Sequence, residues 1–393
     1  MSRDRVANLD ILLLTASIWF LAKFVRYAFP PLFPEFQSVY GVSNATLGLA
    51  YTAMMLVYAL MQFPSGLLAD KFGSPHVIVG GLLTAMGGVF LLSWPGSFIF
   101  LTVGMILVGL GTGVHKTVAV TYLSQMYAEN KGRSIGVLDT FGTTAGVAAP
   151  ALVVVFVNTH GWEMLFFGTG CVGILLAGVF LSRASSKGPV ETATQPTDTA
   201  SITDYIALFR NGRFSAFVVL TVAYSFTYNG VVAFLPLYLT EATPVSSTIA
   251  TVLYGVLFAV SFVQLATGDL SDRLGSLHVI TGTILIALLG FVGLFVGSTP
   301  IALGVAVAFF GIGAHGFRPV RGVYLVEILP PSLAGGGLGA VRTILMGAGA
   351  LSPAVVGYVS DSISFRASFG VLLVSLVFAV VTAFGLLITE RQS

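Results

Sequence analysis

Long continuous runs of hydrophobic residues alternate with short polar segments along this chain. A helix that crosses a bilayer needs about 20 mainly apolar residues, and most of these runs reach that length. The runs are continuous rather than alternating, which predicts helices and not the strands of a membrane barrel. We therefore predict twelve membrane-spanning helices, at residues 10–33, 45–69, 76–94, 98–124, 134–157, 163–182, 214–240, 246–268, 277–297, 300–327, 333–358 and 366–389.

The one long polar interval, residues 183–213, is rich in Ser, Thr and Pro and carries charges of both signs. Such a composition is typical of a linker. It separates the first six predicted spans from the last six. The predicted fold is therefore an all-α membrane protein of two six-helix bundles, residues 1–182 and 214–393, joined by a linker at residues 183–213.

The composition supports a bilayer as the surroundings of this chain. Of its 393 residues, 56% are hydrophobic and only 9% are charged, whereas a soluble domain has roughly 25% charged residues. The net charge of +2 gives no indication of a nucleic-acid partner. A single cysteine, Cys171, excludes an internal disulfide and a zinc site made of cysteines.

The distribution of Lys and Arg predicts the orientation, because cytoplasmic loops carry an excess of positive charge. With the N-terminus inside, only Arg366 falls near the outer side. We therefore expect both termini and the linker to be cytoplasmic. The residues then placed inside are Arg3, Arg5, Lys71, Lys131, Arg133, Arg183, Lys187, Arg210, Arg213, Arg273 and Arg391.

A polar phrase of thirteen residues occurs twice. "GLLADKFGSPHVI" begins at Gly66 and "GDLSDRLGSLHVI" begins at Gly268, and eight of the thirteen positions match. The same shift of 202 residues carries Lys116 onto Arg318. The two halves of the chain are therefore expected to be copies with the same topology.

This phrase, placed once in each half, resembles the inner-loop signature of the major facilitator superfamily, whose transporters are built from two parallel halves. The resemblance covers nearly the whole chain and implies two pseudo-symmetric six-helix bundles. It also implies that the loop latches the halves together when the outer side is open. The latch residues carried over are Gly66, Asp70, Lys71, Gly73, Gly268, Asp272, Arg273 and Gly275.

The residues of the phrase also suggest a local role. Gly66 and Gly73 are expected to allow a tight turn and a close approach of helices. The alternative to a latch is that the phrase holds ordinary turn residues that follow the positive-inside rule.

The predicted spans contain more cations than anions. A charge near the bilayer centre costs at least roughly 2.5–3.5 kcal/mol, so each needs a partner, water or a ligand. The resemblance implies that spans one, four, seven and ten line a central cavity, which would surround one space with Lys23, Arg26, Lys116, Arg318 and Arg321. One hypothesis is a site for a carboxylate or phosphate, since Arg suits bidentate recognition of such groups. Tyr228 and Asn229 would complete it.

The other hypothesis is internal pairing. Lys116 would pair with Asp139 on the next span, and Arg321 or Arg342 would pair with Glu327. Such pairs would fix helices and touch no substrate.

Four residues are candidates for carrying a proton. His115 and His315 titrate near neutral pH as free side chains, and a desolvated carboxylate such as Asp139 or Glu35 gains affinity for protons. The alternative for the histidines is a structural hydrogen bond between helices.

We therefore expect a secondary transporter that moves a small organic anion by alternating access, coupled to protons and functional as a monomer. One alternative is a proton-coupled exporter of drugs or other amphipathic compounds, and a second is a membrane receptor that does not transport. No metal-ligand spacing, nucleophile elbow or nucleotide loop occurs. The sequence accordingly predicts no enzyme activity, no metal and no cofactor.

Overall fold

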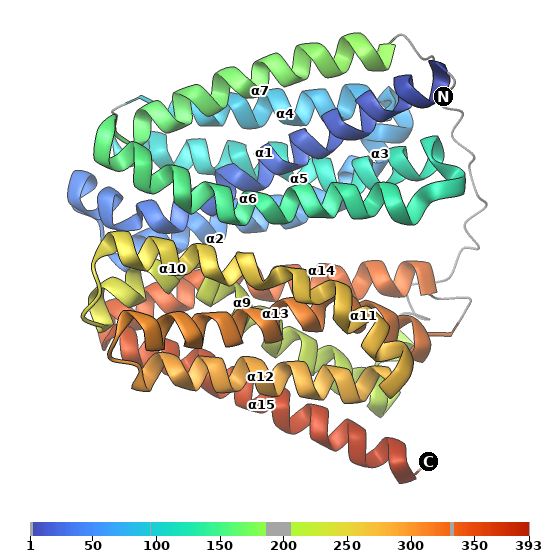
Figure 1. Ribbon diagram of the computed structural model, residues 1–393, viewed down its shortest axis with the longest axis vertical. Helices are drawn as coiled ribbons and strands as arrows, with labels where there is room; N and C mark the ends of the chain where they lie inside the picture. Colours follow the sequence, from blue (N-terminus) through green and yellow to red (C-terminus); the bar gives the residue numbers. More distant parts are fainter. Residues whose placement is uncertain (1–2, 95, 186–205, 331–333, 393) are drawn as a thin grey trace. The chain divides into compact units, whose positions relative to one another are not determined.

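The computed structural model describes residues 3–94, 96–185, 206–330 and 334–392, with side chains for residues 9–94, 96–184, 206–330 and 341–390. All regular elements within these ranges are helices (Figure 1). Eleven helices in the described chain are long and apolar enough to cross a membrane, or up to twelve when one bent pair counts as a span. The all-α membrane fold predicted from the sequence is confirmed.

The helices follow one another in the same order in both halves of the chain. The first half contains α1 (Arg3–Tyr40), α2 (Asn44–Leu60), α3 (Gln62–Phe72), α4 (Ser74–Leu92), α5 (Phe98–Met126), the short η1 (Ala128–Asn130), α6 (Lys131–Thr159) and α7 (Trp162–Ser185). The second half contains α9 (Gly212–Ala242), α10 (Ser247–Ala259), η2 (Val260–Phe262), α11 (Val263–Leu274), α12 (Ser276–Val296), α13 (Pro300–Ile328), α14 (Ala334–Ser362) and α15 (Phe365–Gln392).

The shift of 202 residues seen in the sequence is kept in the structure. It carries both ends of α5 onto both ends of α13, and the start of α4 onto the start of α12. Gly73 and Gly275 sit between the equivalent helices with positive φ angles of 82° and 87°. Only glycine adopts such a conformation without strain, so each phrase makes its sharp turn at this residue.

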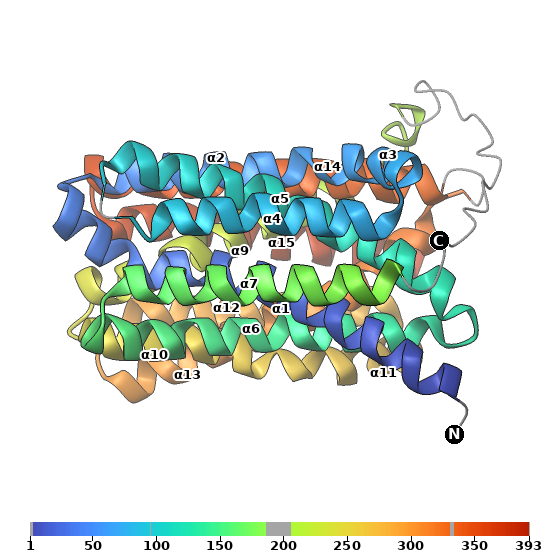
Figure 2. The same cartoon turned by 90° about the horizontal axis from the view of Figure 1, so that it is seen from above.

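Equivalent helices also make equivalent contacts. In the first half α1 packs against α6 and α7, and α4 packs against α5 and α7 (Figure 2). In the second half α9 packs against α14 and α15, and α12 packs against α13 and α15. Gly111 of α5 and Gly313 of α13 allow close approaches of their helices, because a Cβ on either would overlap the neighbouring helix backbone. Small residues serve this purpose where helices pack in membranes.

Three predictions about local structure were wrong. The first span does not end at residue 33 but continues to Tyr40, because a membrane helix tolerates Pro30, Pro31 and Pro34. The second span breaks into α2 and α3, which are bent by 44°. Gly66 and Gly268 lie inside α3 and α11 with open space around them, so neither forms the turn or a close helix contact.

Contacts between Cα atoms divide the chain into two compact units. One is Met1–Val42 with Ala50–Thr194, and the other is Ser43–Leu49 with Gln195–Ser393. The first turn of α2 thus belongs to the second unit, where Asp361 accepts hydrogen bonds from the backbone of Asn44 and Ala45 at 3.1 and 2.7 Å. Most of the predicted linker, including Lys187, lies outside the described residues, and the domain boundaries at 182 and 214 stay predictions.

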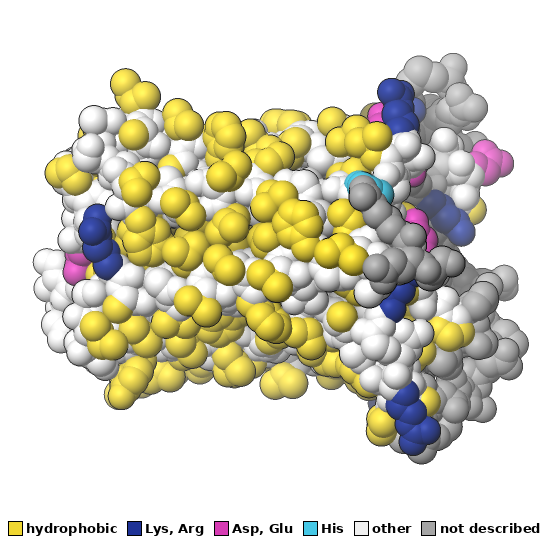
Figure 3. Space-filling model, turned by 90° about the horizontal axis from the view of Figure 1, so that it is seen from below, with side chains coloured by type: hydrophobic (Ala, Val, Ile, Leu, Met, Phe, Trp, Pro, Cys, Tyr) yellow, Lys and Arg dark blue, Asp and Glu magenta, His cyan; other side chains and the backbone are white. Residues whose placement is uncertain are grey.

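Large hydrophobic side chains are exposed along most of the helices, as a bilayer requires. On the face drawn in Figure 3, hydrophobic side chains cover the middle of the helices, and most of the charged side chains lie toward their ends. The side chains of Arg3, Arg5 and Arg391 lie outside the described residues. The predicted orientation of the termini therefore stays a prediction.

Candidate functional site

Four charged residues of the first half gather around one buried tryptophan. We call this group the Trp19 cluster: Trp19, Lys23 and Arg26 of α1, Tyr58 of α2, His115 and Lys116 of α5, and Asp139 of α6. One side of Trp19 packs into the apolar core with Ala16, Ala119 and Leu138. The indole is only 3% exposed, so it forms a fixed surface on which the charged side chains rest.

Three cations share the Trp19 ring. Lys23 Nζ, Arg26 Cζ and Lys116 Nζ lie 5.4, 5.6 and 5.5 Å from its centre. The guanidinium of Arg26 also lies 4.0 Å from the ring centre of Tyr58 and is almost buried, with 7% of the residue exposed. An aromatic face attracts a cation by roughly 0.5–2 kcal/mol, which is less than the cost of removing a charge from water. The rings therefore hold these cations in place without neutralising them.

Lys116 has a direct acidic partner. Its Nζ forms an ion pair with the carboxylate of Asp139 on α6. The Lys116 side chain is 15% exposed and that of Asp139 is 53% exposed. The pairing that the sequence left open is therefore present, and the exposed fraction of Asp139 argues against the desolvated carboxylate expected of a proton carrier.

His115 is buried in the same cluster. Its ring stacks on Trp19 at 5.8 Å, and its Nε2 lies 3.1 Å from the backbone oxygen of Thr15. A carbonyl oxygen only accepts, so Nε2 is the nitrogen that carries the hydrogen. Among the described residues, neither His115 Nδ1 nor Trp19 Nε1 has a hydrogen-bond partner.

The second half contains a comparable group. We call it the Tyr228 cluster: Tyr224, Tyr228 and Asn229 of α9, and His315, Phe317, Arg318 and Arg321 of α13. Arg318 Cζ lies 4.3 Å from the Tyr228 ring centre, and Arg321 Cζ lies 5.9 Å from that of Phe317. Both halves therefore place an arginine over a buried tyrosine.

Ring contacts and hydrogen bonds fix this second cluster. Tyr228 and His315 meet edge to face at 6.0 Å, and the Tyr224 hydroxyl donates to the backbone oxygen of Ala314 at 2.7 Å. Asn229 Nδ2 donates to the backbone oxygen of Ser225 at 2.8 Å. The aromatic residues of α9 are thus held against α13 before any ligand arrives.

Two predicted residues lie elsewhere. Glu35 is half-buried nine residues after Arg26 in α1, about 14 Å along the helix, and so is not part of the Trp19 cluster. Glu327 is exposed and accepts a hydrogen bond from Ser276 at 2.9 Å. Its suggested pairing with Arg321 or Arg342 stays a prediction.

The repeated phrase places its charged residues at the ends of two short helices. Asp70 and Lys71 are exposed in the last turn of α3, and Asp272 and Arg273 are exposed in the last turn of α11. The equivalent positions of these pairs agree with the repeat. Their role as a latch stays a prediction.

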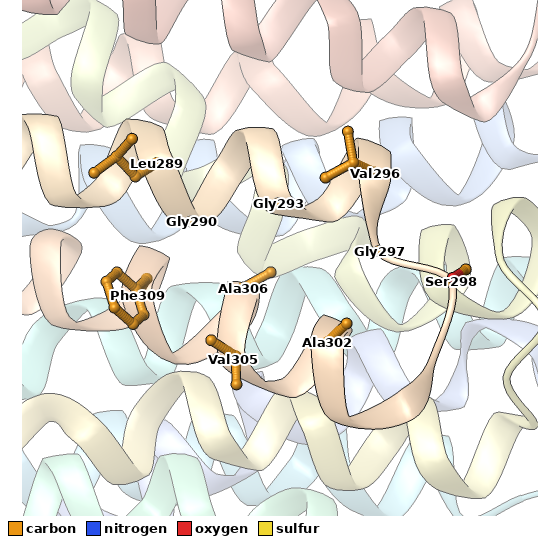
Figure 4. A pocket seen from close by; sticks show the side chains of 10 residues that line it. All are labelled: Leu289, Gly290, Gly293, Val296, Gly297, Ser298, Ala302, Val305, Ala306 and Phe309. Atoms are coloured by element: carbon orange, nitrogen blue, oxygen red, sulfur yellow. The ribbon is translucent and has the colours of Figure 1, made fainter.

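An apolar groove of about 370 Å³ lies between α12 and α13 (Figure 4). It contains none of the predicted substrate residues. Ser298 is its one polar side chain, which makes it unsuitable for a charged solute. Its lining is Leu289, Gly290, Gly293, Val296, Gly297, Ser298, Ala302, Val305, Ala306 and Phe309.

Sequence reasoning missed the aromatic partners of the first cluster. Trp19 could have been found, because it precedes Lys23 by four residues and so shares one face of α1. Tyr58 lies 32 residues from Arg26 with no local signal that links them.

The sequence profile of the Major Facilitator Superfamily matches this chain over residues 15–309 and 242–393. One curated relative is a probable sulfoacetate transporter of Cupriavidus necator, 28% identical over 184 residues, which are 45% of this chain and 42% of that protein. The chain thus spans less than half the length of that relative. A probable 4-methylmuconolactone transporter of Cupriavidus pinatubonensis is 23% identical, over 92% of this chain and 86% of that protein.

Among solved structures, the chain is similar to a bacterial homologue of the human lysosomal transporter Spinster. The TM-score is 0.80 at 17% identity, and the match covers 100% of this chain and 98% of that one. At this identity the similarity establishes the shared fold.

Proposed function

This chain belongs to the Major Facilitator Superfamily, and from that premise we propose that it carries a small organic anion across the membrane by alternating access. Its relatives are transporters rather than enzymes. Transporters of this architecture bind their substrates near the middle of the bilayer.

One observation supports an anionic substrate above all. Each half holds an arginine inside an apolar bundle, over a tyrosine ring, at Arg26 with Tyr58 and at Arg318 with Tyr228. A cation held in this way keeps its charge, which attracts a carboxylate, sulfonate or phosphate. Charge-assisted bonds of this kind are about twice as strong as neutral ones.

One curated relative supports the same substrate class. Sulfoacetate, named for one of them, carries a sulfonate and a carboxylate. We propose that the substrate of this chain likewise carries at least one such group. Protons are the proposed coupling ion, and His115 and His315, one in each arginine-bearing cluster, are the candidate carriers because a free imidazole exchanges its proton near neutral pH.

The proposed topology has both termini in the cytoplasm. That arrangement follows from the excess of Lys and Arg in the loops on one side. The further expectation that the two clusters line one hydrated cavity stays a prediction.

Binding and flux test this proposal together. The purified protein is titrated with sulfoacetate, acetate, succinate and phosphate while its unfolding temperature is measured, and the anion that stabilises it most becomes the probe anion. Proteoliposomes are then assayed for uptake of the probe anion with and without a proton gradient. We expect stabilisation and saturable uptake.

Three results would change this proposal. Stabilisation and flux with cationic drugs, but not with any anion, would favour the exporter. Stabilisation by an anion without flux under any gradient would favour a receptor. Uptake that is indifferent to the proton gradient would remove proton coupling and keep the anion substrate.

A further inference from the structure

Gly142 in α6 lies directly against two side chains of the Trp19 cluster. A Cβ at this position would overlap the indole nitrogen of Trp19 and would lie 2.6 Å from Trp19 Cδ1 and 3.2 Å from Lys23 Cδ. Real side chains do not approach a Cβ this closely, so an alanine here would displace the indole. The glycine thus provides the space in which Trp19 sits.

Gly349 in α14 likewise lies directly against side chains of α9. A Cβ at Gly349 would overlap the amide nitrogen of Asn229, 3.1 Å from Asn229 Cγ and 2.7 Å from Ser225 Oγ. The shift of 202 residues carries Lys23 onto Ser225. The helix pairs α1–α6 and α9–α14 are also equivalent, so each half has a glycine packed against its candidate site, although the shift carries Gly142 onto Ile344 and not onto Gly349.

These two glycines differ from Gly111 and Gly313, which pack helices together by their backbones. At Gly111 and Gly313 an added Cβ would meet backbone atoms of the neighbouring helix, which is the usual reason for a glycine at a helix contact. At Gly142 and Gly349 it would meet the side chains of candidate site residues. The space beside Gly142 and Gly349 is therefore filled by side chains of the candidate site, in addition to letting the helices approach each other.

We propose that Gly142 and Gly349 are positioning residues, which set where the Trp19 cluster and the Tyr228 cluster present their polar groups to the substrate. This inference rests on the proposed function. In the first half, the indole held by Gly142 carries Lys23, Arg26 and Lys116 on its face. A displaced indole would therefore shift three cations at once. In the second half, Gly349 fixes the amide of Asn229.

The chain offers matched controls on the same helices. Gly136 in α6 and Gly347 in α14 have nothing within 4 Å of an added Cβ. Gly136→Ala and Gly347→Ala make the same chemical change in open space, where alanine favours the helix. Any difference between the test and control variants then reports the contact with the site and not the loss of a glycine.

The experiment measures affinity for the probe anion and transport kinetics in proteoliposomes. We expect Gly142→Ala to weaken binding by about tenfold or more, since overpacking forces side chains out of position. Gly349→Ala is expected to weaken it by about threefold or more. The concentration for half-maximal uptake should rise with little change in maximal rate, and both controls should match the wild type.

A double variant separates positioning from simple damage. Trp19→Ala removes the indole that the new methyl group would meet. If Gly142→Ala acts by displacing the indole, it should cause little further loss of affinity in the Trp19→Ala background, so the two effects should not add. Additive losses would show that Gly142→Ala acts elsewhere in the bundle.

The outcomes distinguish the two proposals. If the wild type binds no anion, the proposed function is wrong. If the wild type binds the probe anion and Gly142→Ala and Gly349→Ala bind it as tightly as their controls, positioning is refuted and the proposed function stands. Equal losses in the test and control variants, or additive losses in the double variant, would also refute positioning.

Discussion

The Trp19 cluster and the Tyr228 cluster occupy equivalent places in the two halves but balance their charge differently. Lys116 and Arg318 stand at matching positions. Lys116 pairs with Asp139, whereas the same shift of 202 residues carries Asp139 onto Val341. The position in the second half that corresponds to Asp139 therefore holds no carboxylate.

This difference suggests that the two halves contribute unequally to anion affinity. A cation with a carboxylate partner already has its charge compensated, and an added anion gains little by approaching it. Arg318 lies over a tyrosine ring that attracts the cation but carries no net charge. We therefore expect Arg318 to contribute more to anion affinity than Lys116 does.

The largest effect is expected for Arg318. Arg318→Ala should cost about 1.5–3 kcal/mol of binding free energy, or roughly 10- to 150-fold in affinity, because it removes charge-assisted hydrogen bonds. A thermal-shift titration with the probe anion measures this. Arg318→Lys should recover only part of the affinity, since Lys lacks the planar fork. Full affinity in Arg318→Ala would show that the second cluster is structural.

Arg26 is the closest counterpart in the first half, because it too lies over a tyrosine. Arg26→Ala should weaken binding by roughly tenfold. Tyr58→Leu should weaken binding less, because it keeps the guanidinium and removes only the ring that holds it in place. The same titration compares the two variants. If Tyr58→Leu loses more affinity than Arg26→Ala, the ring rather than the cation contacts the substrate.

Substitutions in the Lys116–Asp139 pair are expected to change anion affinity less, and Asp139→Asn should raise the affinity rather than lower it. Lys116→Ala should change affinity by no more than roughly threefold, whereas Asp139→Asn should raise it by leaving Lys116 uncompensated. Asp139→Asn should also lower the free energy of unfolding by about 1 kcal/mol, a modest value because Asp139 is half exposed. Chemical denaturation checks the second effect. A loss of anion affinity in Asp139→Asn would contradict this assignment.

The smallest effect on binding is expected for the repeated phrase. Asp70→Asn and Asp272→Asn should leave affinity within roughly twofold, since charge–dipole contacts at exposed helix ends contribute only about 0.3–1 kcal/mol. Both variants should change the rate of uptake in proteoliposomes if the residues act as a latch. An unchanged rate in both would leave them as ordinary turn residues.

Much of the fold could be read from the sequence because the bilayer imposes a strong pattern. The apolar runs gave the helices, and the shift of 202 residues gave the equivalence of α5 with α13. Helix ends near proline could not be read in the same way. Pro30, Pro31 and Pro34 suggest an end to the first helix, but a membrane helix tolerates proline and α1 continues to Tyr40.

The candidate site was only partly predictable. Charged residues in apolar runs stand out, so the cations and the possible pairing of Lys116 with Asp139 could be found. Tyr228, under Arg318, was among the predicted residues. Tyr58, under Arg26, could not be found, because it comes from another helix and an aromatic residue in an apolar run has no distinctive signal. Gly66 shows the opposite error, since a repeated glycine suggested a turn that Gly73 alone makes.

The most direct test compares Arg318→Ala with Lys116→Ala in parallel titrations with the probe anion at one pH and one salt concentration. These residues occupy equivalent positions, and Lys116 pairs with Asp139, whereas Val341 stands at the position equivalent to Asp139. The account predicts that Arg318→Ala loses at least several times more affinity than Lys116→Ala. Equal losses, or a larger loss for Lys116→Ala, would contradict the claim that the second half supplies the dominant charge for the anion.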